Sequence, residues 1–158
     1  MSDKYAPNLT CEEMDQLLCE EDVGRLAMCC DSQPYCVPVN YAFLDGKIVF
    51  HCAVQGRKLD FLRANPRVCF VVDRHPDRLQ PHHPDGKCNY RFESVLCFGT
   101  ARVLEDPCER RDYLQKFRTH FNLRLGLPAD QDSVAPEQAE TCGCVVLTLE
   151  ERTGRRKD

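Results

Sequence analysis

The sequence lacks the long apolar run of roughly 20 residues that a membrane-spanning helix needs. Its first residues, MSDKYAPNLT, are polar and contain no apolar core of a secretory signal. We therefore expect a cytoplasmic protein that does not associate with membranes. Charge of one sign is not concentrated either, because the net charge of −4 is spread along the chain. This pattern argues against nucleic-acid binding and favours small-molecule or protein partners.

Several catalytic signatures are also missing. No Gly-x-Gly-x-x-Gly fingerprint is present, so the sequence predicts no Rossmann-type dinucleotide site. No Gly-x-Ser-x-Gly elbow or ordered triad indicates a serine nucleophile. Tryptophan is absent altogether, and there is no internal repeat. With 158 residues the chain is long enough for one domain, and we expect a single core.

Cysteine, in contrast, is abundant, with twelve in the chain. Without an export signal we expect reduced thiols rather than a disulfide scaffold. A set of four lies in apolar, strand-like runs and is expected to pack as small hydrophobic residues: Cys36, Cys52, Cys69 and Cys97. Cys29-Cys30 and Cys142-Gly-Cys144 approach metal or redox spacing, but no second pair completes a tetrahedral site. A thiol-based redox sensor remains an alternative.

The apolar periodicity predicts a mainly β protein with flanking helices. Thr10 to Glu13 form a capping box, which predicts a helix that continues through Leu17 and Leu18 and ends at Gly24. Asp106-Pro107 begins another helix, with Leu114, Phe117 and Phe121 on one face. Strand-like runs cover Arg25 to Cys30, Tyr35 to Phe43, Lys47 to Cys52, Val68 to Asp73, Ser94 to Leu104 and Cys144 to Glu150. Six short strands favour an antiparallel barrel or sandwich.

Two segments are predicted to be loops, Arg74 to Asn89 and Gly126 to Glu140, because both are rich in turn-forming residues. The first contains a set of zinc or iron ligand types: His75, His82, His83 and Cys88. Their spacing matches no closed metal site, so a solvated loop is the favoured interpretation. We predict no metal.

An anion site is predicted where a strand turns directly into a helix. Phe50 ends a strand-like run, and Leu59 and Leu62 stand one helical turn apart before Asn65-Pro66. Arg57 and Lys58 therefore lie at a helix N-terminus, where free N–H groups and the helix dipole attract an anion. Phosphate is the obvious ligand.

Several short motifs follow one another in a fixed order. They are Val23-Gly24-Arg25-Leu26-Ala27, Pro38-Val39-Asn40-Tyr41, Phe50-His51-x-Ala53-x-x-Gly56-Arg57-Lys58, Asn65-Pro66-x-Val68-Cys69-Phe70, Cys88-x-Tyr90-x-x-x-Ser94-Val95-x-x-x-Gly99-x-Ala101 and Thr153-Gly154-Arg155. In order and spacing the chain resembles the FMN-binding split β-barrel family related to pyridoxamine 5′-phosphate oxidase. The branch that includes the nitroimidazole-resistance reductases is the most similar.

The resemblance implies a six-stranded antiparallel split β-barrel of the FMN-binding type, formed by one domain over residues 1–158. Residues 1–9 would be an N-terminal arm, 126–140 a loop and 151–158 a polar tail. It also implies a homodimer with one FMN per chain at the interface.

The resemblance also assigns residues to the cofactor. Arg57 and Lys58 match the pair that holds the FMN phosphate, in agreement with the anion site. The cofactor's ring would lie beside the strand backbone of Val39, Asn40 and Tyr41. Ser94 and Val95 would approach the cofactor of the partner subunit, and His51 would stand near the flavin or substrate. Without the resemblance, a hydrogen-bonded barrel histidine would be the simpler role for His51.

Vitamin B6 oxidation is disfavoured, because that enzyme closes its site with a segment carrying Trp and Arg, whereas this chain has no Trp and ends in ERTGRRKD. We predict instead an FMN-dependent oxidoreductase that reduces a small flat acceptor such as a nitroaromatic, with His51 as the catalytic hydrogen-bond or proton donor. NAD(P)H, as a donor, would dock transiently over the flavin. The alternative is a flavin-binding or haem-binding module without turnover.

Overall fold

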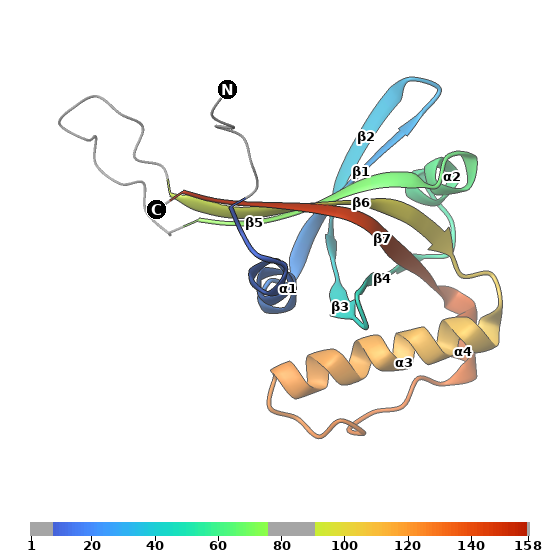
Figure 1. Ribbon diagram of the computed structural model, residues 1–158. Coiled ribbons are helices and arrows are strands. Elements are labelled where there is room, and N and C mark those ends of the chain that lie inside the picture. Colours follow the sequence, from blue (N-terminus) through green and yellow to red (C-terminus); the bar gives the residue numbers. More distant parts are fainter. Residues whose placement is uncertain (1–7, 76–90, 158) are drawn as a thin grey trace, which may run out of the picture.

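The computed structural model describes residues 8–75 and 91–157. A seven-stranded antiparallel sheet curls into a half-barrel, and helices flank it (Figure 1). The strands are β1 Val23–Cys30, β2 Gln33–Asn40, β3 Ala42–Leu44, β4 Lys47–Ala53, β5 Arg67–Arg74, β6 Phe92–Val103 and β7 Cys142–Lys157. The helices are α1 Cys11–Glu20, α2 Arg57–Ala64, α3 Pro107–Arg124 and α4 Pro136–Thr141. The predicted split-barrel class is confirmed, with seven strands in place of six.

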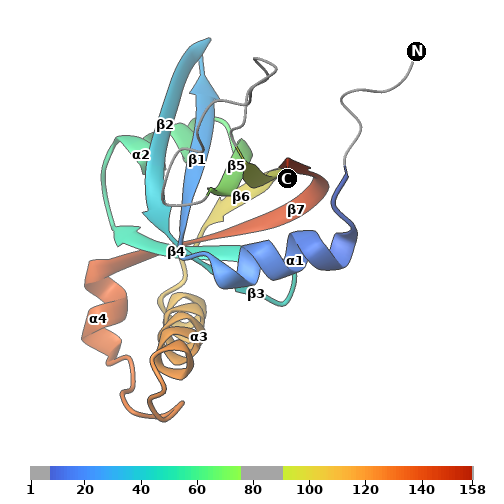
Figure 2. The same ribbon diagram turned by 90° about the vertical axis from the view of Figure 1, so that its left-hand side faces the viewer.

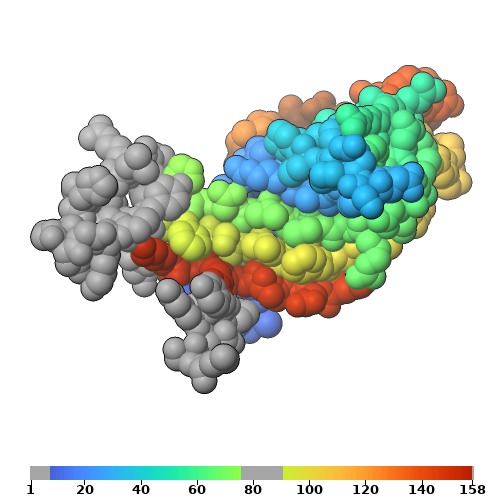
Figure 3. All heavy atoms as spheres, turned by 90° about the horizontal axis from the view of Figure 1, so that it is seen from above, coloured from blue at the N-terminus to red at the C-terminus, as the bar shows by residue number. Residues whose placement is uncertain are grey.

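The extra strand arises because the predicted run from Tyr35 to Phe43 is interrupted at Tyr41. The Tyr41 N–H donates to the carbonyl of Asp22 at 3.0 Å, and its hydroxyl donates to the carbonyl of Leu18 at 2.8 Å. One residue therefore separates β2 from β3, although the strand order β2-β1-β5-β6-β7-β4-β3 places them at opposite edges of the sheet. The sheet has to curl to bring these two edges together. Figure 3 shows β1 and β2, β5, β6 and β7 side by side along the outside of this curl.

Helix α1 begins as predicted but ends earlier. The hydroxyl of Thr10 accepts the N–H of Glu13 at 3.2 Å, and the Glu13 carboxylate accepts the Thr10 N–H at 2.8 Å, which completes the capping box. The prediction that Gly24 ends this helix is wrong, because the helix stops at Glu20 and Gly24 lies in β1. A side chain at Gly24 would overlap the ring of Phe70, so close packing explains the glycine.

The predicted polar tail is a strand. Residues 151–157 continue β7 and pair with β6 from Phe92 to Phe98. Polar residues form a strand here because Gly154 lies directly beneath Met14 of α1, while the Asn8 side chain bonds the N–H and carbonyl of Arg156 at 2.6 and 2.7 Å. Of the predicted arm, Asn8 and Leu9 are described, and both N–H groups bond the carbonyl of Gly154.

Helices α3 and α4 cover the part of the sheet made by β3, β4 and β7, on the side of β4 away from β1 and β2 (Figure 2). Asp106 caps α3 by accepting the Glu109 N–H at 2.7 Å, and Leu114 and Phe117 are buried as predicted. The predicted loop over 126–140 is corrected in part, since Pro136–Thr141 form α4 with Pro at the start. Among the described residues, no helix is both long and apolar enough to cross a membrane.

The apolar residues form two clusters on opposite faces of β4 and β7. Ile48 and Phe50 belong to the larger cluster inside the curl, whereas Val49 belongs to the smaller cluster under α3 and α4. Both faces of β4 are buried, which explains its continuous apolar run. Immediately after this run come His51 and the turn into α2.

Candidate functional site

A cleft follows the seam where edge strand β2 approaches β4. Its walls are Pro38, Val39 and Asn40 from β2, His51 to Ala53 from β4, and Lys58 from α2, and its volume is about 410 Å³. Among the strands that the structure describes, β2 pairs with β1 alone, so these strands leave the backbone groups on its other edge unused. Such groups bind the polar edge of a planar ligand. We call this space the seam cleft.

The start of α2 forms a smaller hollow of about 220 Å³ between Tyr35 and residues 52–59. Gly56 occupies the N-cap position with φ +134°, a conformation that side-chain-bearing residues rarely adopt. A Cβ at Gly56 would meet no heavy atom within 4 Å, so a ligand has open access to the backbone. The first N–H groups of a helix have no intrahelical acceptor, and here they stand beside two cationic side chains.

The two cations are held by aromatic rings. The guanidinium carbon of Arg57 lies 4.8 Å from the ring centroid of Tyr35 and 5.3 Å from that of Phe61. Lys58 Nζ lies 5.2 Å from the ring centroid of Phe50. Lys58 lines both the hollow and the seam cleft, which also share Cys52 and Ala53. The hollow and the seam cleft therefore adjoin each other, and Lys58 makes the region that they share positively charged.

His51 stands at the other end of the seam cleft. Its ring meets the ring of Phe117 edge-on, with 5.0 Å between centroids. Partial burial lowers the pKa of His51 below its ordinary value, and the positive charge of Lys58 lowers it further. A neutral imidazole is thus favoured near pH 7, and it carries one hydrogen-bond donor and one acceptor.

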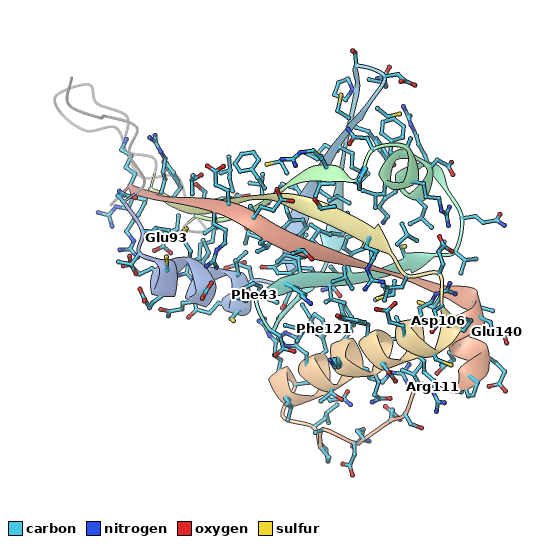
Figure 4. All side chains as sticks on the ribbon, turned by 45° about the vertical axis from the view of Figure 1, so that its right-hand side comes forward. Phe43, Glu93, Asp106, Arg111, Phe121 and Glu140 are labelled. Carbon is cyan, nitrogen blue, oxygen red and sulfur yellow. The ribbon has the colours of Figure 1, made fainter. Side chains whose placement is uncertain are left out.

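A third space of about 430 Å³ lies beyond His51, between β4, α3 and α4. It shares Asn40 and His51 with the seam cleft. Figure 4 shows Phe121 on the side of α3 that faces the sheet, where it lines this space. We call it the α3 cavity.

Of the predicted cofactor residues, Val39, Asn40, His51 and Lys58 line the seam cleft, and Arg57 lines the adjacent hollow. The structure does not bring the others there. The side chain of Tyr41 is buried in the core, and its N–H is already bonded to Asp22.

Ser94 and Val95 lie on β6, paired with β5 and β7, and Val95 is fully buried. Neither lines the seam cleft of its own chain. Their expected approach to a partner's cofactor stays a prediction.

Sequence reasoning missed Tyr35 and the residues of the α3 cavity. Tyr35 gave no signal beyond strand propensity. Arg118 and Asn122 did give one, because they continue the apolar stripe of Leu114, Phe117 and Phe121 at helical spacing. Polar residues on an apolar helix face point to a polar role inside.

The described cysteines form no disulfide, and only Cys97 and Cys144 are buried. Burial raises the pKa of both of these thiols to about 12. Cys36 is exposed, which corrects its expected packing role. Burial also raises the pKa of Cys30 and Cys142, the opposite of what a reactive redox thiol needs.

Within the described parts of the chain, no group of three or more metal-ligating residues comes together. His82, His83 and Cys88 of the predicted ligand set lie outside the described residues. His75 is described and lies at the end of β5.

The chain matches the family model described as pyridoxamine 5′-phosphate oxidase over residues 10–156. An uncharacterised protein of Rhizobium meliloti is 40% identical over 61 residues, which span 39% of this chain and 40% of that protein. The match therefore covers less than half of this curated relative.

Solved structures agree with the fold. An FAD-binding protein of Mesorhizobium loti is 25% identical, with TM-score 0.70 over 95% of this chain and 96% of that one. A protein described as a putative 5-nitroimidazole antibiotic resistance protein, from Bacteroides thetaiotaomicron, is 22% identical, with TM-score 0.74 over 94% and 84%. An FAD and heme binding protein of Mycobacterium smegmatis is 16% identical, with TM-score 0.81 over 96% and 73%.

Proposed function

The chain belongs to the pyridoxamine 5′-phosphate oxidase family, and on that premise we propose that it is an FMN-dependent oxidoreductase that reduces a small flat acceptor such as a nitroaromatic compound. The observation that carries the proposal is the junction of the seam cleft with the N-terminus of α2. An edge-strand backbone, a neutral histidine and a cationic helix start lie around two adjoining spaces that share Cys52, Ala53 and Lys58. These are the donors that a flavin nucleotide needs for its ring and its phosphate.

The residues present fit this cofactor. Gly56 leaves the backbone open at the helix start, and Arg57 and Lys58 supply the charge that a phosphate requires. Val39 and Asn40 offer backbone groups to the ring along β2. Tyr41 contributes by holding the end of β2 in place, through its bond to Leu18, rather than by contact with the ring.

Bound FMN supplies the two-electron redox chemistry. The chain itself positions the acceptor and moves protons. His51 lies between the seam cleft and the α3 cavity, and its neutral ring donates a hydrogen bond to an oxygen that gains charge on reduction. The electrons come from NAD(P)H or another carrier that docks transiently.

FMN is proposed rather than FAD because Arg57 and Lys58 at the start of α2 form one anion site, which matches the single phosphate of FMN. Two of the three similar structures named above are described as FAD-binding, so the choice needs a direct test. Calorimetric titration of flavin-free protein with FMN, FAD and riboflavin separates the three. We expect FMN to bind most tightly, and equal affinity for FMN and riboflavin would contradict the phosphate assignment.

A homodimer with flavin at the interface is part of the proposal. Exposed apolar side chains near the end of α3, at Leu123, Leu125 and Leu127, offer surface that an association would cover. Light scattering of the flavin-loaded protein measures the mass directly. A monomer that holds flavin fully would exclude the shared site and the proposed role of Ser94 and Val95.

A second candidate function is a flavin or haem carrier without turnover, which the similarity to an FAD and heme binding protein favours. The absorption spectrum of the purified protein distinguishes flavin bands from a haem band. Steady NAD(P)H oxidation that depends on an added nitroaromatic supports the oxidoreductase. Flavin binding without any acceptor-dependent turnover supports the carrier.

A further inference from the structure

The α3 cavity has the wall of an aromatic binding site. Leu114, Phe117 and Phe121 from α3 and Val134 from the following segment form its apolar side. The ring centroids of Phe117 and Phe121 are 4.8 Å apart and the ring planes are tilted by 44°, so the two rings present one bent aromatic surface. A volume of about 430 Å³ lies within the range of small-molecule sites, which is roughly 300–1,000 Å³.

The outer wall is fixed by hydrogen bonds rather than left as a loose loop. Arg111 Nε donates to the carbonyl of Val134 at 2.8 Å, and the Val134 N–H donates to the Gln115 side chain at 2.8 Å. An Arg110 guanidinium nitrogen donates to the carbonyl of Ala139 in α4 at 2.8 Å. The cavity is therefore preformed, which lowers the entropy cost of binding.

One polar group in this wall lacks a partner. Asn122 is only 7% exposed, and its buried side-chain nitrogen Nδ2 forms no hydrogen bond with any described residue. A buried donor without an acceptor destabilises a protein by about 1–3 kcal/mol. Asn122 lines the α3 cavity, so a ligand oxygen that reaches Nδ2 from there would remove this cost.

A cation stands one helical turn away. Arg118 lines the same cavity and is half-buried, and one of its guanidinium nitrogens donates to the carbonyl of Ser133 at 3.0 Å. Within residues 8–75 and 91–157, no carboxylate forms an ion pair with it. Residues four apart on a helix face the same side, and Arg118 and Asn122 both line the α3 cavity from that face.

We propose that the α3 cavity binds a planar aromatic carboxylate. Its carboxylate accepts hydrogen bonds from Arg118 and Asn122, and its ring packs on Phe117 and Phe121. The opposite end of the ring then points toward His51, which also lines the seam cleft. That this end carries the reducible group rests on the proposed function, whereas carboxylate binding does not.

The experiment is calorimetric titration of the protein with 4-nitrobenzoate, with and without FMN, and with neutral 4-nitrobenzyl alcohol for comparison. We expect the acid to bind at least tenfold more tightly than the alcohol. Asn122→Leu removes the donor at similar volume and should weaken acid binding about tenfold while the melting temperature holds or rises. Arg118→Gln should abolish the preference for the acid. Lys116→Gln, on the same helix but outside the cavity, should leave binding unchanged.

If Asn122→Leu does not fold, the affinities of the Arg118→Gln variant for the acid and for the alcohol test the proposal instead. A variant that still prefers the acid overturns it. Equal affinity of the wild type for both compounds, or displacement of FMN by the acid, overturns the proposal. Acid binding that depends on Asn122 and Arg118 in a protein that takes up no flavin supports the cavity and contradicts the proposed function. Flavin uptake without acid binding overturns the proposal for the α3 cavity and leaves the proposed function in place.

Discussion

The ring of His51 on β4 meets the ring of Phe117 on α3 edge-on, with 5.0 Å between centroids and 87° between planes. This contact stands between the seam cleft, which has Lys58 in its wall, and the α3 cavity, which has both an aromatic wall and polar side chains. His51 is the titratable group that lines both spaces. A ligand in either space therefore contacts the same imidazole, so the protonation state of His51 affects binding in both the seam cleft and the α3 cavity.

The pKa of His51 should lie below its ordinary value of 6.5, because partial burial and Lys58 both disfavour the charged ring. As the pH falls, the unfolded chain takes up this proton first, so the stability contributed by the neutral ring is present above about pH 6.5 and is lost as the pH falls toward the lowered pKa. Nuclear magnetic resonance titration of the ring protons measures the value.

Lys58→Met should raise the pKa of His51, because it removes the neighbouring charge. Lys116→Met, a matched change on α3, should leave it in place. His51→Gln should make the melting temperature fall less between pH 7 and pH 5. His120, whose pKa is also lowered by burial, should contribute a further part of the fall. A His51 pKa above 6.5 in the wild type would contradict the assignment.

Arg57→Gln combined with Lys58→Gln should weaken FMN binding by about 100-fold or more, since hydrogen bonds to a charged group are each worth about 1.5–3 kcal/mol. Riboflavin, which has no phosphate, should bind the wild type and the double variant alike. Fluorescence quenching of each flavin measures both affinities.

Arg63→Gln with Lys116→Gln is the matched control, because it removes the same charge away from the hollow. It should leave the ratio of FMN to riboflavin affinity unchanged. A double variant at Arg57 and Lys58 that still prefers FMN would place the phosphate elsewhere.

Local signals in the sequence were sufficient wherever one short segment determines the structure. The capping box at Thr10, the Asp106-Pro107 helix start and the turn from β4 into α2 are all found as predicted. The start of α2 at Arg57 followed from Gly56 and from the helical spacing of Leu59 and Leu62, and the anion site expected there stays a prediction.

Features that depend on contacts between distant segments were not predictable. Polar residues 151–157 form a strand only because β6 and α1 are there to pair with them. Tyr41 interrupts a strand-like run because its bonds to Leu18 and Asp22 exist only after α1 has packed. The helical spacing could have placed Asn122 on the apolar face of α3, but the cavity that it lines depends on β4 and α4 and is encoded by no local pattern.

Gly24→Ala should destabilise the protein by about 1–3 kcal/mol, because the new methyl group would overlap the Phe70 ring in a filled core. Phe70→Leu in the same chain should recover part of this loss by making space. Urea unfolding of the wild type, both single variants and the double variant measures the coupling. Additive effects would mean that the two residues do not meet.

Deletion of residues 152–158 distinguishes a strand from a free tail. In the structure this segment pairs with β6 from Phe92 to Cys97, and Arg156 bonds Glu93 at 2.7 Å and Glu13 at 3.0 Å. Loss of the ladder and of the packing between Gly154 and Met14 should lower stability by more than about 4 kcal/mol. At this chain length the melting temperature should fall by about 10 °C or more.

The matched control for the deletion is Glu151→Gln, an exposed change immediately before the deleted segment, which should alter stability by less than about 0.5 kcal/mol. The Thr10 N–H and then Arg156 lower the pKa of Glu13, and for Glu93 the bonds from Arg156 and Arg74 outweigh the opposing effect of burial, so that its pKa is also lowered. The part of this stabilisation that Arg156 supplies is therefore present above pH 4.5 and is lost below it. The difference in melting temperature between the full chain and the shortened chain should therefore narrow as the pH falls below 4.5. A shortened chain as stable as the full one would show that residues 152–158 form no part of the sheet.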